Sequence, residues 1–301
     1  MSALSSPAST ELQLQPQDAA PPFDGPFADM ILRSCDGIRF HVSKYILSIA
    51  SPVFADMFRL AVAAASLDEM CDGLPMVPMT EDAATLDLLL RWCYPTPRPP
   101  LATLEDVQRM VGAMQKYDIH AFDEVAQEAL QMHLARDPSA MLSIAIKFRM
   151  CEWTRRAVLA LPLATLMSHP GLADRTLLAL IRYHTACGAA ASAVTSRRDF
   201  FEDTFFTTEY GGPCCQYCSC LDHQGSSWSA PRFVWNFLDQ ADHALLLHPH
   251  RDAVISLCKI EECDRCRRAY EQQRDIEKLV QRLVREVNVA VEQVPVPDFW
   301  L

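Results

Sequence analysis

Glycine is scarce in this chain: only 9 of the 301 residues are glycine. Phosphate loops, dinucleotide-binding turns and the sharp turns that present a nucleophilic serine need glycine at fixed spacings. None of these motifs occurs in the sequence. The sequence therefore gives no support for a nucleotide-dependent enzyme or a serine hydrolase.

Long apolar runs and a surplus of positive charge are also missing. No uninterrupted stretch of about 18 apolar residues occurs, so we expect no membrane-spanning helix and no membrane partner. The chain has 27 Lys and Arg against 38 Asp and Glu, which gives a formal net charge of −11. Because nucleic-acid affinity depends on clustered cations, we expect no nucleic-acid partner for a broad surface of this chain.

A secretion signal is not recognisable, because the N-terminus lacks a basic start and an apolar centre. Residues 1–24 are rich in Ser, Pro, Gln and Ala, which predicts a disordered leader. The 12 cysteines are therefore not expected to form the disulfides of a secreted domain. We expect a cytoplasmic or nuclear protein, long enough for two globular domains.

The most informative pattern lies in residues 29–58. An apolar run ends at Asp36-Gly37, a pair typical of a tight hairpin, and apolar residues alternate along the next five positions. The apolar period then changes to three and four, which predicts two short helices. Ser51 is the expected N-cap of the second helix, and Pro52 its first residue.

Further elements follow this helix pair. Residues 74–79 predict a strand whose two prolines favour a sheet edge or a position that needs no N–H group. Thr80 is the expected cap of the next helix, which ends at the Pro-rich segment 94–100. Thr103 predicts the start of another helix, and residues 122–134 form a further amphipathic segment.

This order of elements resembles the BTB/POZ domain. Residues 89–94 (LLRWCY) are similar to the family's element of a helix followed by Tyr, and residues 113–118 (AMQKYD) are similar to its Ala–x–x–Tyr element. The resemblance covers about residues 27–134, and we place the domain at 25–135. It implies an α+β fold, with a short hairpin, an edge strand and helices, and a role in protein–protein interaction and dimerisation.

Two charged residues match positions of the family's dimer face. Asp29 stands where the family carries an acid at the start of its strand, and Lys44 matches its basic residue at the start of the first helix. The resemblance implies that this acid and this base are partners in a charged pocket at the dimer interface. The alternative is two exposed charges that contribute little. Ser43 departs from the family pattern, which usually has His there.

Residues 136–190 are expected to form a helical extension, which begins with the favourable N-cap pair Asp137-Pro138. Apolar periodicity predicts helices within it. The Ala- and Ser-rich stretch 188–195 is the expected break before a Cys-rich, helical C-terminal domain at 196–301.

Two Cys-x-x-Cys pairs stand in this C-terminal domain: Cys215 with Cys218, and Cys263 with Cys266. Four thiolates are a complete ligand set for a tetrahedral structural zinc, so we predict a zinc ion that staples the domain. The main alternative is four reduced thiols without metal. The eight ligands of a RING finger are not present, so we expect no intrinsic ligase activity of that type. The residues that could replace one of the four ligands are Cys214, Cys220 and His223.

The segments around these pairs support a helical domain. Residues 233–246 predict an amphipathic helix that could bring the second pair back to the first, and the second pair opens a long helix at 267–291. This arrangement resembles a group of fungal BTB proteins with a Cys-x-x-Cys, an aromatic-rich helix and a later Cys-x-x-Cys-Arg. Arg267 completes the last of these matches.

The sequence offers only poor candidates for a catalytic site. His248 and His250 are suggestive, but they close an apolar helix, where histidine is favoured for other reasons. We therefore expect no enzyme but a dimerising BTB scaffold or adaptor, homo- or hetero-dimeric. The resemblance implies an adaptor role for a cullin-type ubiquitin ligase in many members. The alternative is a transcriptional regulator that binds DNA through the Cys-rich region, against which the acidic balance counts.

Overall fold

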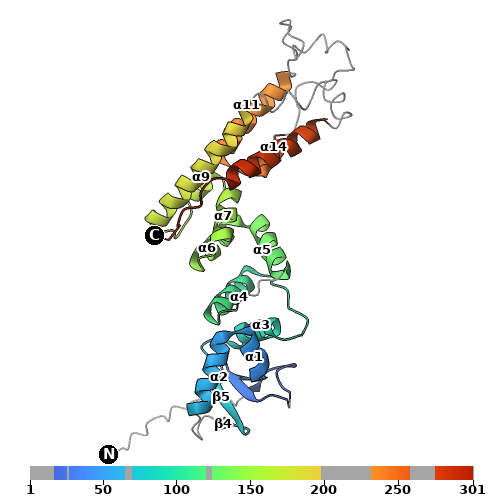
Figure 1. Ribbon diagram of the computed structural model, residues 1–301, viewed down its shortest axis with the longest axis vertical. Coiled ribbons are helices and arrows are strands. Elements are labelled where there is room, and N and C mark those ends of the chain that lie inside the picture. Colours follow the sequence, from blue (N-terminus) through green and yellow to red (C-terminus); the bar gives the residue numbers. More distant parts are fainter. Residues whose placement is uncertain are drawn as a thin grey trace, which may run out of the picture. The chain divides into compact units, whose positions relative to one another are not determined.

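The computed structural model describes six stretches of the chain, which form two compact units, Met1–Gln131 and Met132–Leu301 (Figure 1). Each unit has its own buried apolar core. The cysteines of both predicted zinc-binding pairs lie outside the described residues. The described stretches are 17–25, 27–64, 70–119, 124–197, 232–257 and 275–300.

The first unit contains a mixed sheet with the strand order β1-β3-β2-β5-β4. The predicted hairpin is confirmed: β2 and β3 are antiparallel, with Leu32 opposite Phe40, and Gly37 has a φ of 90° in the turn. Such a φ is accessible to glycine without steric cost. The strands are β1 (Gln17–Asp18), β2 (Met30–Arg33), β3 (Ile38–Val42), β4 (Met70–Cys71) and β5 (Leu74–Pro78).

Helices pack beside this sheet, and the expected helix pair begins where it was predicted. The hydroxyl of Ser51 accepts the N–H of Phe54 at 3.0 Å, so Ser51 caps the helix that starts at Pro52. Thr103 and Asp106 form a complete capping box. The helices are α1 (Lys44–Ala50), α2 (Pro52–Ala64), α3 (Ala83–Cys93), α4 (Leu104–Lys116) and α5 (Glu124–Arg136).

The expectation of a disordered leader up to residue 24 is wrong for residues 17–24. β1 pairs with β3 in parallel, and the side chain of Phe23 is completely buried. Its ring packs edge-on against Tyr94, with the centroids 5.2 Å apart, and its carbonyl accepts the N–H of His41 at 2.9 Å. One aromatic residue in a polar segment therefore anchors that segment to the core.

Two further expectations for the first unit can be compared with the structure. Of the two positions expected for the strand with two prolines, β5 is not at a sheet edge, because it pairs with β2 on one side and with the two-residue β4 on the other. The other expectation, a position that needs no N–H group, fits Pro78. Pro78 is tolerated because the next N–H, that of Met79, makes the bond to Arg33 on β2. The cap of α3 is Asp82, which accepts the N–H of Thr85 at 2.8 Å, and not Thr80.

The second unit is built from helices around α9, which contacts α7, α8, α11 and α14. Asp137 accepts the N–H of Ala140 and Pro138 follows it, so the predicted start of α6 is confirmed. The described helices are α6 (Pro138–Lys147), α7 (Cys151–Ala160), α8 (Leu163–Met167), α9 (Asp174–Thr195), α11 (Arg232–Leu247), α12 (Arg251–Ile255) and α14 (Asp275–Glu292).

The expected break at residues 188–195 is wrong, because α9 continues through this stretch without interruption. The small residues serve helix packing. A Cβ on Gly188 would lie only 2.7 Å from the carbonyl oxygen of Leu246 on α11. Further along, the Thr195 hydroxyl donates to Asp242 of α11 at 2.9 Å. The residue order of these contacts shows that α9 and α11 are antiparallel.

Among the described helices, α9 alone is long and apolar enough to cross a membrane by length and composition. The sequence reading did not expect such a helix. Its contacts with four other helices, and buried residues such as Leu180, Tyr183 and Cys187, are typical of a helix at the centre of a helical bundle.

Replacing Gly188 with Ala tests the close contact of α9 and α11. Ala normally favours a helix over Gly, but here the added Cβ must displace the backbone of α11. We expect the free energy of unfolding of the second unit to fall by about 1–3 kcal/mol, as for other overpacked cores. Chemical denaturation measures this. Ala189→Ser, on the exposed face of α9, is the control, and an equal loss in both variants would contradict the packing.

Candidate functional site

The strongest candidate for an interaction surface is an apolar groove beside α1. Tyr45 and Ile49 lie one helical turn apart on α1, and their exposed fractions are 74% and 71%. Exposed apolar residues at this spacing form a stripe on a helix face. The groove encloses about 330 Å³. The residues that line this α1 groove are Tyr45, Ile46, Ile49, Ala50, Trp92, Cys93 and Ile119.

The start of α1 is fixed by two hydrogen bonds to main-chain N–H groups. The carboxylate of Asp29 accepts the N–H of Lys44 at 2.7 Å. The phenol oxygen of Tyr94 accepts the N–H of Ser43, also at 2.7 Å. Both bonds satisfy donors that a helix start leaves without partners inside the helix. They hold the helix in place and leave its outer face uncovered.

Asp29 and Lys44, the residues predicted for a charged dimer pocket, are therefore neighbours in the structure. Their contact differs from the predicted one, because Asp29 binds the main chain of Lys44. A carboxylate at the first turn of a helix also interacts favourably with the helix dipole. Asp29 thus has a structural role at the start of α1, whatever the Lys44 ammonium binds.

Tyr94 joins the groove to the N-terminal segment. Its ring packs on Phe23, and its oxygen bonds to Ser43. Burial raises the pKa of Tyr94, so the phenol stays neutral at physiological pH. This is the Tyr that resembles the family's helix-then-Tyr element.

A buried polar network supports α1 from behind. The hydroxyl of Ser51, at the junction of α1 and α2, donates to the carbonyl of Tyr117. The Tyr117 ring stacks on Phe54 with centroids 4.4 Å apart, and its hydroxyl donates to Glu81 at 2.5 Å. Lys116 also binds Glu81. This network explains the Ala–x–x–Tyr resemblance as a packing element.

The charge state of Glu81 follows from this network. Burial raises the pKa of Glu81, but the hydrogen bonds from Lys116 and Tyr117 outweigh that effect and hold the pKa below its usual value. For Tyr117, burial and then the bond to Glu81 raise the pKa. Glu81 is therefore ionised and Tyr117 neutral at physiological pH.

Cys93, which lines the α1 groove, is chemically quiet. Burial raises the pKa of its thiol to about 11. The thiolate is the nucleophilic and metal-binding form of cysteine, and it is scarce at neutral pH for such a thiol. The groove therefore has the character of a contact surface.

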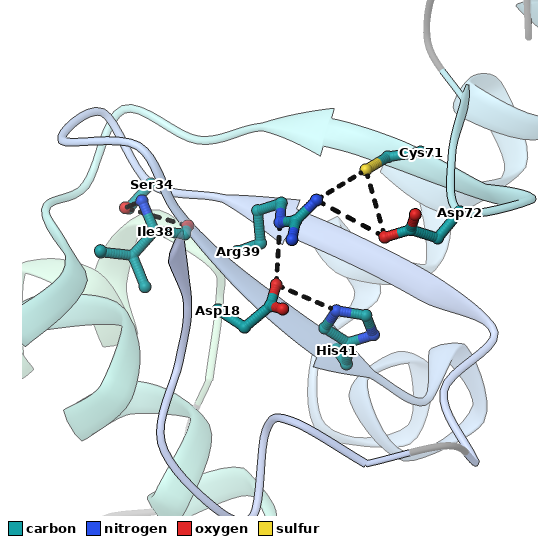
Figure 2. Close-up of polar contacts among 7 residues, drawn as sticks. All are labelled: Asp18, Ser34, Ile38, Arg39, His41, Cys71 and Asp72. Atoms are coloured by element: carbon teal, nitrogen blue, oxygen red, sulfur yellow. Dashed lines mark hydrogen bonds and ion pairs between the residues drawn. The ribbon is translucent and has the colours of Figure 1, made fainter. Parts of the chain in front are cut away.

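A second polar cluster surrounds Arg39 on β3 (Figure 2). The guanidinium binds Asp18 of β1 at 2.8 Å, and it lies 3.1 Å from the sulfur of Cys71 and 3.5 Å from Asp72. His41 also faces Asp18, at 3.4 Å. Figure 2 shows Arg39 between residues of both ends of the sheet. The cluster ties β1 and the β4–β5 turn to β3.

Cys215, Cys218, Cys263 and Cys266 all lie outside the described residues. Within the described stretches, no group of three or more His, Cys, Asp or Glu side chains is placed to hold a metal ion. The five described cysteines are all free thiols.

Sequence reasoning missed the role of Tyr45 and Ile49. The change of the apolar period predicted the helix pair but did not single out these two residues, and on α1 the completely buried residue is Leu47. The sequence signal for this surface is the spacing of Tyr45 and Ile49, two apolar residues four positions apart on the side of α1 opposite Leu47. One apolar side of α1 packs on the core, so the other apolar side is available for a partner.

Comparison with known families identifies the first unit. Residues 23–134 match the family model of the BTB/POZ domain. This confirms the resemblance for the N-terminal part of the chain. BTB/POZ domains generally mediate protein–protein interaction and dimerisation. The comparison with curated proteins found no match.

Replacing Tyr117 with Phe tests the network behind α1. The variant keeps the stacking on Phe54 but removes the bond to Glu81. We expect the free energy of unfolding of the first unit to fall by about 1–2 kcal/mol at pH 7. Thermal and urea denaturation followed by circular dichroism measure it, with Gln108→Ala, at an exposed position of α4 outside the groove, as the control.

This loss should depend on pH with a defined sign. Because the folded-state pKa of Glu81 is depressed, its stabilising contribution is present above the unfolded value near 4.5 and is lost as the pH falls through the folded value. The difference between wild type and Tyr117→Phe should therefore shrink in acid. A difference that stays constant down to pH 2 would contradict the role of ionised Glu81.

Proposed function

We propose that this chain, with a BTB/POZ domain as its N-terminal part, is a non-enzymatic interaction protein that dimerises through the α1 groove. The observation that carries the proposal is the exposure of Tyr45 and Ile49 beside a groove of about 330 Å³. A two-fold dimer brings the same patch of both copies together, so each copy supplies both a groove and a stripe.

The free energy gained by burying Tyr45 and Ile49 is large enough to affect the stability of the dimer. Burying one large apolar side chain contributes roughly 1.5–3 kcal/mol, so Tyr45 and Ile49 from two copies contribute about 6–12 kcal/mol. Association costs on the order of 4–15 kcal/mol in lost freedom of motion. Because the two quantities are comparable, removing one of these side chains from both copies should shift the equilibrium strongly toward monomers.

Asp29 and Lys44 remain our candidates for charged residues at this interface. Lys44 directly precedes Tyr45 on α1, and Asp29 is bound to its N–H group. A charged pair at the rim of an interface affects partner choice and association rate more than affinity. We propose that role for these two residues.

The proposal extends to an adaptor role, with a cullin-type ubiquitin ligase as the partner, on the basis of the family resemblance alone. Mixing the purified chain with the N-terminal domain of a cullin tests it directly. The proposal includes a reducing compartment, the cytoplasm or the nucleus, where cysteines remain thiols. No observation among the residues that the structure describes favours the alternative of DNA binding.

Replacing Ile49 with Glu tests the dimer. The substitution places two carboxylates in an apolar interface, where burial of an unpaired charge is costly. We expect the dissociation constant of the dimer to rise by at least about 100-fold, measured by sedimentation velocity over a concentration series. Leu178→Glu, an exposed apolar position on α9 of the other unit, is the control and should behave as wild type. Equal dimerisation of the Ile49 variant would exclude the α1 groove.

We further propose a structural zinc bound by Cys215, Cys218, Cys263 and Cys266. In the described residues, α9 ends and α11 begins at one end of the second unit, because the two helices are antiparallel. α14 begins at that same end (Figure 1). The two Cys-x-x-Cys pairs precede α11 and α14 by 14 and 9 residues (232 minus 218 and 275 minus 266). Each pair thus precedes, in the sequence, a helix that begins at this end of the unit.

Metal analysis tests this proposal. The full chain, purified under reducing conditions without chelator, should contain about one zinc ion per molecule by inductively coupled plasma mass spectrometry. Cys263→Ser should lose most of it, because three thiolates hold zinc more weakly than four. Cys151→Ser removes an exposed thiol outside the four and should keep the zinc. Wild-type protein without bound metal would overturn the assignment.

A further inference from the structure

Three histidines come together in the second unit near the end of α7. His184 on α9 is completely buried, and its Nε2 lies 3.0 Å from the carbonyl oxygen of Leu161. A carbonyl only accepts hydrogen bonds, so Nε2 must carry the proton of the neutral ring. Nδ1 of His184 is buried and has no partner within the described part of the chain.

His248 lies at the same corner, in the link between α11 and α12. The backbone carbonyl of Ala160, the last residue of α7, acts on this ring and raises the pKa of His248 against the larger effect of burial. Its Nε2 is buried and likewise has no partner among the described residues. The end of α7 and the residue that follows it therefore stand beside one histidine from α9 and one from the α11–α12 link.

His250 completes the cluster as the N-cap of α12. Its ring stacks on that of His248 with centroids 5.7 Å apart, and its Nδ1 faces the carboxylate of Asp252 at 3.2 Å. This histidine has an anionic neighbour, which the other two rings lack in direct contact. As the N-cap residue, it also accepts the N–H of Asp252 on Nδ1 at 3.4 Å, so this nitrogen carries no proton in the neutral ring.

The surroundings of His184 and His248 disfavour a second proton on either ring. A proton on Nδ1 of His184 or on Nε2 of His248 would create a buried N–H group without an acceptor, which costs free energy. Burial lowers the pKa of His184, and the nearby ring of His248 lowers it further. Burial also lowers the pKa of His248 and of His250. Two charged rings at this corner would also repel each other.

The charged groups around the cluster come from α12 and α7. On α12, Asp252 raises the pKa of His248 and His250, and Arg251 lowers that of His250. On α7, Arg155 is paired with Glu152, 3.1 Å away. Beside His184 on α9 stand the neutral Tyr183 and Cys187, whose pKa values are raised by burial. No carboxylate in the described residues thus compensates a charge on His184.

We propose that His184 and His248 form an acid-sensitive latch in the second unit. While both rings are neutral, they tie α9 and the α11–α12 link to the corner after α7. When each ring takes up one proton, the link is released from that corner. This inference goes beyond dimerisation by the first unit, so either proposal can fail while the other holds.

The direction of the pH effect follows from the geometry and from the lowered pKa values. The open state binds protons near the ordinary histidine value of about 6.5, whereas the closed state resists them. The closed state is therefore fully favoured above about pH 7 and loses stability as the pH falls below about 6.5. For each histidine, a pKa difference of one unit between the two states corresponds to a tenfold change in population.

Hydrogen exchange of the full chain, read by mass spectrometry at pH 7.5 and 5.0 and corrected for intrinsic exchange rates, tests the latch. The relevant amides are those of Leu161, His248 and Ala253, which are hydrogen-bonded in the closed state. We expect their protection to fall by at least about tenfold at pH 5.0. Amides of the β2–β3 hairpin in the first unit serve as the internal reference and should keep their protection.

The double variant His184→Gln with His248→Asn keeps a donor near each carbonyl but cannot take up a proton, so its protection should not depend on pH. His243→Gln, an exposed histidine on α11, should behave as wild type. Unchanged protection of the wild type, or the same loss in the double variant, would overturn the latch.

If the double variant does not fold, proton NMR titration of the wild-type imidazoles decides. Titration of the His184 and His248 rings below pH 6, together with the loss of amide protection, supports the latch. Titration of these rings near pH 6.5 without loss of amide protection contradicts it.

Discussion

The buried hydroxyl of Ser51 is the contact on which the first unit depends. It caps α2 by accepting the N–H of Phe54 and donates to the carbonyl of Tyr117 after α4, while the backbone N–H of Ser51 donates to Leu47 and ends α1. Its side chain is completely buried, so these bonds have no competition from water. Because three helices meet at this hydroxyl, the direction of α1 is fixed, and with it the face that carries Tyr45 and Ile49. A surface for partners is useful only when the helix below it is held rigidly.

The second unit has a comparable centre in α9. Gly188 lets α11 approach closely, while His184 joins α9 to the corner after α7. The same helix thus makes a close packing contact with α11 and, one turn earlier, a buried hydrogen bond to Leu161. Packing makes the unit stable at neutral pH, and the histidine makes part of that stability conditional on protonation. The first unit therefore carries a rigidly held interaction surface, and the second unit contains a region whose stability depends on pH.

Local sequence signals predicted the elements whose stability is local. The hairpin at Asp36-Gly37, the cap at Ser51 and the box at Thr103 all depend on residues within a few positions, and the structure confirms them. The errors concern residues whose partners are distant in sequence. Phe23 anchors the leader through Tyr94, and Gly188 continues α9 because α11 lies against it. Neither partner can be identified from a local pattern.

At the candidate site, too, the contacts between residues distant in sequence could not be predicted. Family resemblance pointed to Asp29 and Lys44 as a charged pair, and the fold shows a contact of another kind, in which Asp29 accepts the main-chain N–H of Lys44. The exposed stripe of Tyr45 and Ile49 was visible as a spacing, yet a spacing does not say which of two apolar sides faces the core. Burial of Leu47 settles that question.

Sedimentation velocity of the wild-type chain tests the central claim most directly. A dimer through the α1 groove should give a species of about twice the chain mass of 33.8 kDa, in reversible equilibrium with the monomer on dilution. A single species of monomer mass at every concentration, up to about 100 μM, would contradict the account.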